Sequence, residues 1–291
     1  MTTNQEGIVP KIHTHTSAEG GIFANAYIIE TQNGLVAVDA TLTVSESKSL
    51  KNLIDSIHKP LLAILLTHPH PDHVAGVTNL LVGSSSSNNI PIVALESVEK
   101  LMRITEEPKR TLCGPVYKGE WIGKWTFPNK LVKDRESVTF DGVMYRVHDL
   151  GPGGDSDANS IWVVESEPKI AFTGDLIFEG THSYIADNHL TEWLNNLEKV
   201  RELLVGDVSK IYPGHGNTGS LNMIDSQKKY LLANSDAVKE LANGKPTLTE
   251  DAKKELTSRI EKFLPNAHLA FLIAHSANAV AAELATADVK Q

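Results

Sequence analysis

The sequence has almost no cysteine. Cys113 is the only one among 291 residues, so no disulfide can form within the chain. A cysteine-rich zinc module and a disulfide-stabilised secreted scaffold are excluded for the same reason. Any bound metal must therefore be held by imidazole and carboxylate groups.

Basic residues are outnumbered. The chain has 27 Lys and Arg against 36 Asp and Glu, and its formal net charge is -9. A surface that binds nucleic-acid phosphates or an anionic membrane needs an excess of Lys and Arg. We therefore expect no nucleic acid and no membrane as partners, although the composition leaves room for a local basic patch.

Long apolar runs are missing as well. The most apolar stretches, residues 61–66 and 267–275, are far shorter than the roughly 20 residues of a membrane-spanning helix. The first residues, MTTNQEGIVPKIHTH, lack the basic start and apolar core of a secretory signal. With 41% hydrophobic and 22% charged residues, the composition is that of a globular protein with a full core. We expect a cytoplasmic protein without a membrane span.

The first half of the chain alternates between strand and helix patterns. IFANAYIIET and LVAVDA, joined through Asn-Gly, predict a β-hairpin, and apolar residues at helical spacing follow it. The run LLAILLT is typical of a strand covered on both faces. This alternation indicates an α/β fold. The predicted elements after the hairpin are a helix at 44–58, a strand at 61–67, a helical stretch at 75–82, a polar link at 84–89, a strand at 90–95 and a helix at 97–107.

Residues 108–130 show no clear period and are rich in Pro, Gly and Trp. We interpret this stretch as a lid or substrate loop; packing of its aromatic residues beneath an ordinary connection is the alternative. The second half returns to strands, then to a helix at 190–205 and the turn YPGHG. Residues after 219 read as helical, with a break at 243–246. We assign this tail to packing against the core or to a homodimer contact.

The segment Thr67-His68-Pro69-His70-Pro71-Asp72-His73 carries three imidazoles and a carboxylate directly after a predicted buried strand. Side chains two apart at a strand exit lie on one side, so His68 and His70 can hold one ion while Asp72 and His73 turn toward a second position. These ligands suit zinc, iron or manganese, and two such ions can share a water whose pKa falls far enough to give hydroxide. The alternative is a polar surface loop that happens to contain histidines.

THPHPDH matches the His-x-His-x-Asp-His signature of the metallo-β-lactamase superfamily. The order VAVDA, THPHPDH, GPGGDSDAN, FTGD and YPGHG also resembles that family, over roughly residues 20–218. The resemblance implies a four-layer αββα sandwich with metals at one edge of the paired sheets. It also implies a catalytic domain at 1–218, followed by a helical C-terminal extension at 219–291.

The resemblance further implies roles for two separate residues. Asp175 in FTGD resembles the carboxylate that bridges both metals, and His215 in YPGHG resembles the last ligand of the second metal. Without the resemblance, Asp175 reads equally well as a helix cap or turn residue, and His215 as a turn residue between glycines.

One position departs from the family pattern. Where a histidine is usual, this chain reads GPGGDSDAN, and counting back from Asn159 places Asp155 there. Asp157 is the alternative, and both are ordinary turn residues if neither binds metal. With Asp155, the first site has two histidines and one carboxylate, a set that also suits non-haem Fe(II). The added negative charge would make a bound water less acidic.

We therefore expect a metal-dependent hydrolase that uses a metal-bound hydroxide to cleave an ester, lactone, thioester, amide or phosphoester bond in a small-molecule substrate. Two Zn²⁺ ions are expected, with Fe or Mn as alternatives, and Asp72 would orient the hydroxide. The alternatives are a mononuclear non-haem Fe(II) sulfur-dioxygenase-like enzyme and a non-catalytic binding protein with a decayed first site. The expected ligands are His68, His70 and Asp155 for the first metal, Asp72, His73 and His215 for the second, and Asp175 for both; His182 and His189 are expected to contact substrate.

Overall fold

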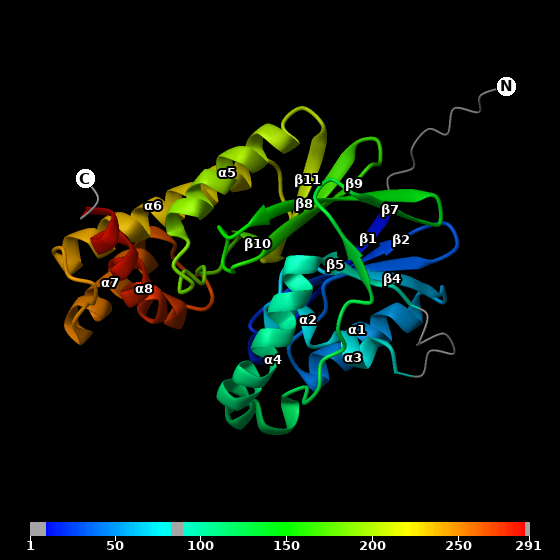
Figure 1. The fold of residues 1–291 in the computed structure, drawn as a ribbon, viewed down its shortest axis with the longest axis horizontal. Helices are drawn as coiled ribbons and strands as arrows, with labels where there is room; N and C mark the ends of the chain where they lie inside the picture. The colour runs from blue at the N-terminus through cyan, green and yellow to red at the C-terminus, as the bar shows by residue number, and fades with distance from the viewer. Residues whose placement is uncertain (1–9, 83–89, 289–291) are drawn as a thin grey trace.

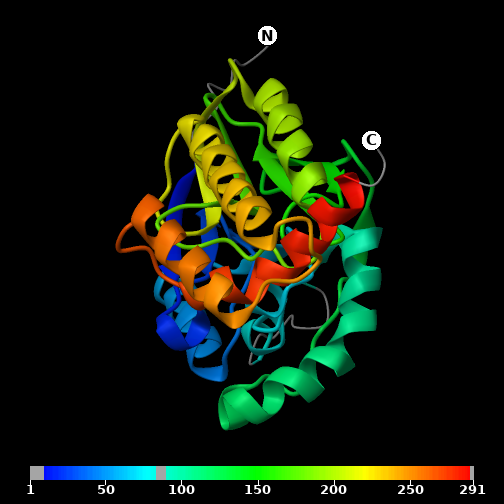
Figure 2. The same ribbon diagram turned by 90° about the vertical axis from the view of Figure 1, so that its left-hand side faces the viewer.

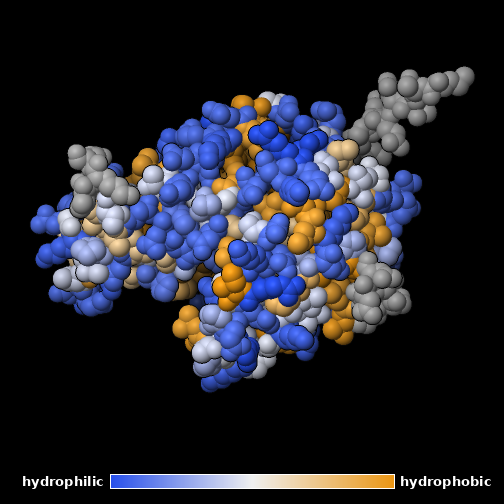
Figure 3. All heavy atoms as spheres, viewed as in Figure 1, coloured by the Kyte–Doolittle hydropathy of each residue, from blue (hydrophilic) through white to orange (hydrophobic). Residues whose placement is uncertain are grey.

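The computed structural model describes residues 10–82 and 90–288. The polar link at 84–89 and most of the N-terminal stretch used to predict a cytoplasmic location lie outside the described residues. Within the part that is described, no helix combines the length and the apolarity needed to cross a bilayer. The face seen in Figure 3 is mostly hydrophilic, with apolar residues in scattered groups.

Two mixed β-sheets form the middle of the molecule (Figure 1). The predicted hairpin is confirmed, because β2 pairs antiparallel with β3, while β3 to β6 run parallel. In the second sheet β10 and β11 are parallel and the other pairs antiparallel. The first sheet has the order β1 (Lys11–Thr16), β2 (Asn25–Glu30), β3 (Leu35–Val38), β4 (Leu61–Leu65), β5 (Ile92–Leu95), β6 (Lys130–Val132), and the second β11 (Val208–His215), β10 (Lys169–Phe178), β9 (Asn159–Val164), β8 (Val143–Gly151), β7 (Ser137–Phe140).

Helices cover the outer face of each sheet, which completes the αββα arrangement (Figures 1 and 2). Helices α1 to α4 lie against the first sheet, and α5 and α6 lie against the second. Helices α7 and α8 pack on α6. The helices are α1 (Val44–Ser56), α2 (Pro71–Val74), α3 (Val77–Leu80), α4 (Glu96–Tyr117), α5 (Leu190–Leu204), α6 (Asn222–Ala242), α7 (Glu250–Phe263) and α8 (Phe271–Asp288), with short 3₁₀ turns η1 (Glu19–Gly21) and η2 (Lys118–Glu120).

The two sheets are joined at the edge where β2 meets β11. The Tyr27 hydroxyl donates to the Pro213 carbonyl at 2.6 Å, and the Asn25 amide donates to the same carbonyl and to that of Gly216. These bonds satisfy carbonyl groups of the YPGHG segment at the edge of the second sheet, where β11 pairs with β10 on its other side. The position of His215 is therefore fixed by side chains of the opposite sheet.

Helix α4 corrects the sequence interpretation of residues 108–130. The predicted helix stops at 107, but α4 continues to Tyr117 with Pro108 and Pro115 inside it. Both prolines are exposed, so water can satisfy the carbonyl groups that lose a helical donor. Beyond the helix, Trp121 and Trp125 are buried in the core, as in the alternative interpretation.

The C-terminal helices share one apolar cluster with the second sheet and α5. The Glu283 carboxylate of α8 accepts hydrogen bonds from the backbone N–H groups of Leu190 and Thr191, the first residues of α5. The predicted break at 243–246 is confirmed, because α6 ends at Asn243 in a left-handed conformation. The division of the chain at residue 218 and a homodimer contact stay predictions.

Candidate metal centre

The histidine-rich segment leaves β4 and turns at once into α2. Pro71 occupies the first helical position, where the missing N–H costs nothing. This tight turn buries His68, Asp72 and His73 almost completely and leaves His70 half-buried. Ionisable side chains are rarely buried unless partners compensate for the lost water.

The second sheet supplies these partners. Asp155 follows β8, Asp175 lies in β10 and His215 ends β11, and all three are buried. In each of two groups, ligand-type atoms lie within 4.8 Å of one another, and Asp175 belongs to both groups. The first group is His68, His70, Asp155 and Asp175, and the second is Asp72, His73, Asp175 and His215.

The second group is the more compact one. His73 Nε2 lies 3.2 Å from Asp175 Oδ1, and His215 Nε2 lies 3.2 Å from Asp175 Oδ2. Asp72 Oδ2 is 3.3 Å from each of these two nitrogens. Two imidazoles and two carboxylates thus face one small volume from both sheets.

Several of the converging atoms make no well-aligned hydrogen bond within residues 10–82 and 90–288, although His73 Nε2 and Asp175 Oδ1 are close to each other. They are His68 Nε2, His73 Nε2, Asp155 Oδ1 and Asp175 Oδ1. Leaving such atoms buried and unpaired is costly, so clusters of them call for an additional binding partner. Imidazole nitrogens and carboxylate oxygens together are the donor set of zinc, iron and manganese. The residues present therefore fit a metal centre.

Asp39, at the end of β3, orients the histidine segment. It adopts a φ of 59° and accepts hydrogen bonds from the backbone and the hydroxyl of Thr67, at 2.8 and 2.7 Å. Asp39 Oδ2 also lies 3.0 Å from His73 Nδ1, and the Thr67 hydroxyl lies 2.9 Å from His68 Nδ1. Contacts at Nδ1 turn the Nε2 atoms toward the centre. The strand-end VAVDA motif was visible in the sequence, but no role was assigned to its aspartate.

A sequence model of the metallo-beta-lactamase superfamily matches residues 20–215. The chain belongs to this superfamily. The beta-lactamase-like protein 2 homolog of Caenorhabditis elegans is 28% identical over 66% of the chain, and this match spans about half, 55%, of the worm protein. The acyl-coenzyme A thioesterase MBLAC2 of Gallus gallus is 23% identical, over 75% of the chain and 79% of its own length.

Solved structures support the fold. A metallo-beta-lactamase from Pontibacter korlensis superposes with a TM-score of 0.58 at 19% identity, covering 76% of this chain and 94% of that one. The segment after residue 215 lies outside the superfamily match.

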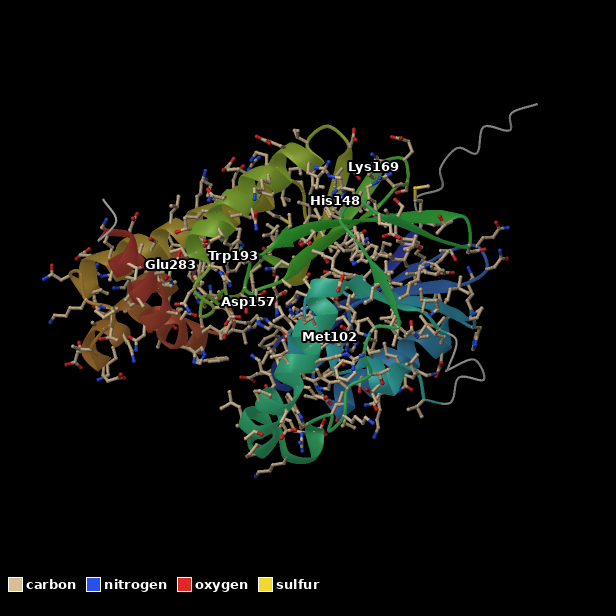
Figure 4. All side chains as sticks on the ribbon, viewed as in Figure 1. Met102, His148, Asp157, Lys169, Trp193 and Glu283 are labelled. Atoms are coloured by element: carbon tan, nitrogen blue, oxygen red, sulfur yellow. The ribbon has the colours of Figure 1, made fainter. Side chains whose placement is uncertain are left out.

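At the position where the superfamily usually has a histidine, the structure brings Asp155 to the centre. Its Oδ2 lies 2.7 Å from His70 Nδ1 and 3.7 Å from His68 Nε2. Asp157 instead has a side chain that is 62% exposed and pairs with His189 at 2.6 Å. Figure 4 shows Asp157 outside the sheets, in the direction of Trp193 in α5. Of the two aspartates, Asp155 is the one beside the histidines of the centre.

Glycine is required around Asp175 both within the second sheet and at its contact with the segment that follows β4. A Cβ on Gly214 would lie 1.7 Å from Asp175 Oδ1, and one on Gly174 would lie 2.5 Å from the Thr67 hydroxyl. Gly174 also has a φ of 49°, which favours glycine. In this superfamily member, the glycines of FTGD and YPGHG therefore make room for the shared carboxylate.

Charges in the centre are strongly coupled. Burial opposes ionisation of Asp72 and Asp175, but the neighbouring histidines outweigh it and hold both pKa values well below the usual range. Burial likewise opposes protonation of His215, yet Asp175 and Asp72 raise its pKa to about 9. Burial raises the pKa of Asp155 despite the contact with His70. Ionised carboxylates in this centre thus need positive charge beside them.

A cavity of about 280 Å³ opens above the centre. His182 and His189, predicted to contact substrate, are not among its lining residues: His182 is buried against the Tyr230 hydroxyl at 3.1 Å, and His189 pairs with Asp157. From the same loop after β10, Tyr184 lines the cavity instead. Its position after the predicted strand KIAFTGDLI places it in a loop that could face a substrate, but the sequence gives no reason to prefer it over the two histidines. The lining residues are Ile22, Leu42, His70, Pro71, Asp72, Lys109, Leu112, Cys113, Tyr117, Trp121, Asp155, Asp175, Phe178, Tyr184, His215, Leu269, Phe271, Leu272 and His275.

Proposed function

We propose that this protein is a metal-dependent hydrolase that cleaves an ester or thioester bond in a small molecule. The observation that carries the proposal is the pair of ligand groups that share Asp175 at the floor of a cavity. The relationship to an enzyme named as an acyl-coenzyme A thioesterase supports the choice of bond. Lactones, amides and phosphoesters are the other substrates within reach of the same chemistry.

The proposed ligands come from both sheets. Zinc is the expected ion, with iron or manganese as alternatives because Asp155 makes the first site a set of two histidines and one carboxylate. When bound, two such ions would act as Lewis acids that lower the pKa of water and stabilise negative charge on an oxygen. The first ion would be held by His68, His70 and Asp155, the second by Asp72, His73 and His215, and both by Asp175.

Asp72 is proposed to orient the attacking water. Its carboxylate lines the cavity, and neighbouring His73 and His215 keep it ionised by lowering its pKa. An ionised carboxylate accepts a hydrogen bond from water and so aims an oxygen lone pair at the substrate carbonyl. Because its pKa is so low, Asp72 positions the water and is a poor carrier of the proton that the reaction releases.

Two alternatives fit the structure less well. A mononuclear iron enzyme needs only His68, His70 and Asp155, yet the second group of four ligand-type residues is complete and buried. A binding protein with a decayed first site would have no metal-binding type of residue where the superfamily usually has a histidine. In this chain Asp155 lies at that position, beside His70. Both observations favour two ions and hydrolysis.

The test is elemental analysis of protein purified without chelator, combined with turnover of a panel of esters and thioesters. About two ions per chain and hydrolysis of at least one panel member are expected. Asp72→Ala should fold, as judged by circular dichroism, and lose at least about a hundredfold in kcat. Full turnover by that variant, or one iron per chain, would contradict the proposal.

A further inference from the structure

The cavity above the proposed metal centre is apolar on the side away from the ligands. Outside the ligand set, polar groups come from Lys109, Cys113, Tyr117, Trp121, Tyr184 and His275, and the Tyr184 hydroxyl already donates to Asp187. A polar or multiply charged substrate would find few partners on this wall. The wall is made by the apolar side chains of Ile22, Leu42, Leu112, Leu269, Phe271 and Leu272.

Two of these side chains are held by a strained backbone. Ile22 has a φ of 52° and Leu269 a φ of 64°, a region that non-glycine residues rarely occupy, β-branched ones least of all. The two turns contact each other, because the rings of Phe23 and His268 stack with centroids 4.0 Å apart. Strain of this kind persists when the surroundings enforce it, and it concentrates at ligand-binding sites.

The rim of the cavity exposes further apolar groups to water. Leu112 on α4 is 72% exposed, and Phe271 at the start of α8 is 62% exposed. Both line the cavity. Because these exposed side chains continue the apolar wall of the cavity, they offer an apolar ligand additional surface to cover. Figure 2 shows that α8 belongs to the C-terminal layer, on the side of the molecule where α4 runs.

We propose that this wall binds the apolar acyl chain of the ester or thioester substrate, and that residues 269–272 set the preference for chain length. This inference rests on the proposed function. Hydrolysis joins the water oxygen to the acyl carbon and breaks the bond from that carbon to the leaving oxygen or sulfur. The products are a carboxylate, a proton and an alcohol or thiol.

The test uses the full metal-loaded chain and p-nitrophenyl esters from acetate to octanoate. Each methylene buried in the wall should raise kcat/KM about two- to fourfold. Leu269→Gly should weaken the dependence of kcat/KM on chain length. The ratio of kcat/KM for the octanoate ester to that for the acetate ester should fall at least fivefold. It should leave Tm unchanged or higher, because glycine accepts the positive φ without strain.

Val116→Ser is the matched control. Val116 is also on α4 and 74% exposed, but it is not among the residues that line the cavity. The dependence of kcat/KM on chain length should therefore be the same as in the wild type. Leu112→Ser, which removes a rim side chain of the same helix, should lower the octanoate-to-acetate ratio. Loss of selectivity in Val116→Ser alone would overturn the assignment of the wall.

Calorimetric binding of octanoate and acetate to the metal-loaded protein separates the two proposals. Tighter binding of octanoate, lost in Leu269→Gly, supports the acyl subsite even if no ester or thioester is cleaved, a result that refutes only the hydrolase. If acetate esters are cleaved as fast as octanoate esters and the two acids bind equally well, the acyl subsite is refuted. The proposed hydrolase activity is then still supported. A Leu269→Gly variant with a lower Tm and unchanged selectivity identifies Leu269 as a packing residue and overturns the inference.

Discussion

Asp155 changes the charge of the centre. A carboxylate at a position usually occupied by histidine adds a negative charge beside His68 and His70. Hard oxygen ligands shift preference toward manganese and iron and away from the strong Zn–imidazole combination. Under the proposed ligand set, Asp155 is therefore the residue that shifts the preference among metals.

Asp155→Ala should lose one of the two expected ions, because the first ligand set keeps only His68, His70 and the shared Asp175. Elemental analysis after dialysis is the measurement. Asp157→Ala, two residues away and exposed, is the control and should retain both ions. Asp155→His should bind two ions again, and the ratio of zinc to manganese in the protein should rise. Unchanged metal content in Asp155→Ala would remove Asp155 from the ligand set.

Asp39 should act through the histidines and not on a metal directly. Asp39→Asn keeps the shape but removes the charge beside His73 Nδ1 and Thr67. We expect metal affinity to fall about 10- to 100-fold, measured by competition with a chromogenic chelator. The number of ions bound at saturation should stay the same. A lower stoichiometry at saturating metal would show that Asp39 is a ligand.

At the scale of elements, the sequence predicted the helices and strands whose formation depends on residues close together in the chain. The β2–β3 hairpin, β4 and α1 follow from Asn-Gly, an apolar run and helical spacing. The length of α4 could not be predicted, because its prolines are tolerated only where water reaches the freed carbonyls. The direction of His182 and Tyr184 depends on packing against α6 and α8, which no local pattern encodes.

The contact between α8 and α5 gives a prediction at this scale. Glu283 caps the N-terminus of α5 through two backbone N–H groups, where a carboxylate also interacts favourably with the helix dipole. Glu283→Ala should lower the free energy of unfolding by about 1 kcal/mol, measured by urea denaturation. Glu261→Ala, an exposed change on α7, should have little effect. Equal losses in both variants would argue against a specific cap.

At the scale of the whole molecule, the candidate metal centre lies between the two halves of the sandwich. His68, His70, Asp72 and His73 follow β4 of the first sheet. In the second sheet, Asp155 follows β8, and Asp175 and His215 lie in β10 and β11. The consecutive ligands were visible in the sequence as one motif. The distant ones were identified only through family resemblance, because spacing along the chain does not encode their convergence.

Removal of metal should therefore loosen the contact between sheets. A ligand that binds only the folded state at about 100 times its Kd adds about 2.7 kcal/mol, which corresponds to a Tm change of roughly 5 °C or more for a chain of this size. Chelator should lower Tm by that amount, and added metal should restore it, as followed by differential scanning calorimetry. Asp175→Ala should be insensitive to chelator. An identical Tm with and without chelator in the wild type would show that metal is not coupled to folding.

The stacked turns at Phe23 and His268 join an early part of the chain to a late one. A ribosome makes every proposed ligand before it makes Leu269, and domains begin to fold during translation. The ion-binding residues can thus assemble on the emerging polypeptide while one wall of the cavity is still unmade. During synthesis, the proposed metal ligands would therefore be in place before the residues proposed to select among substrates.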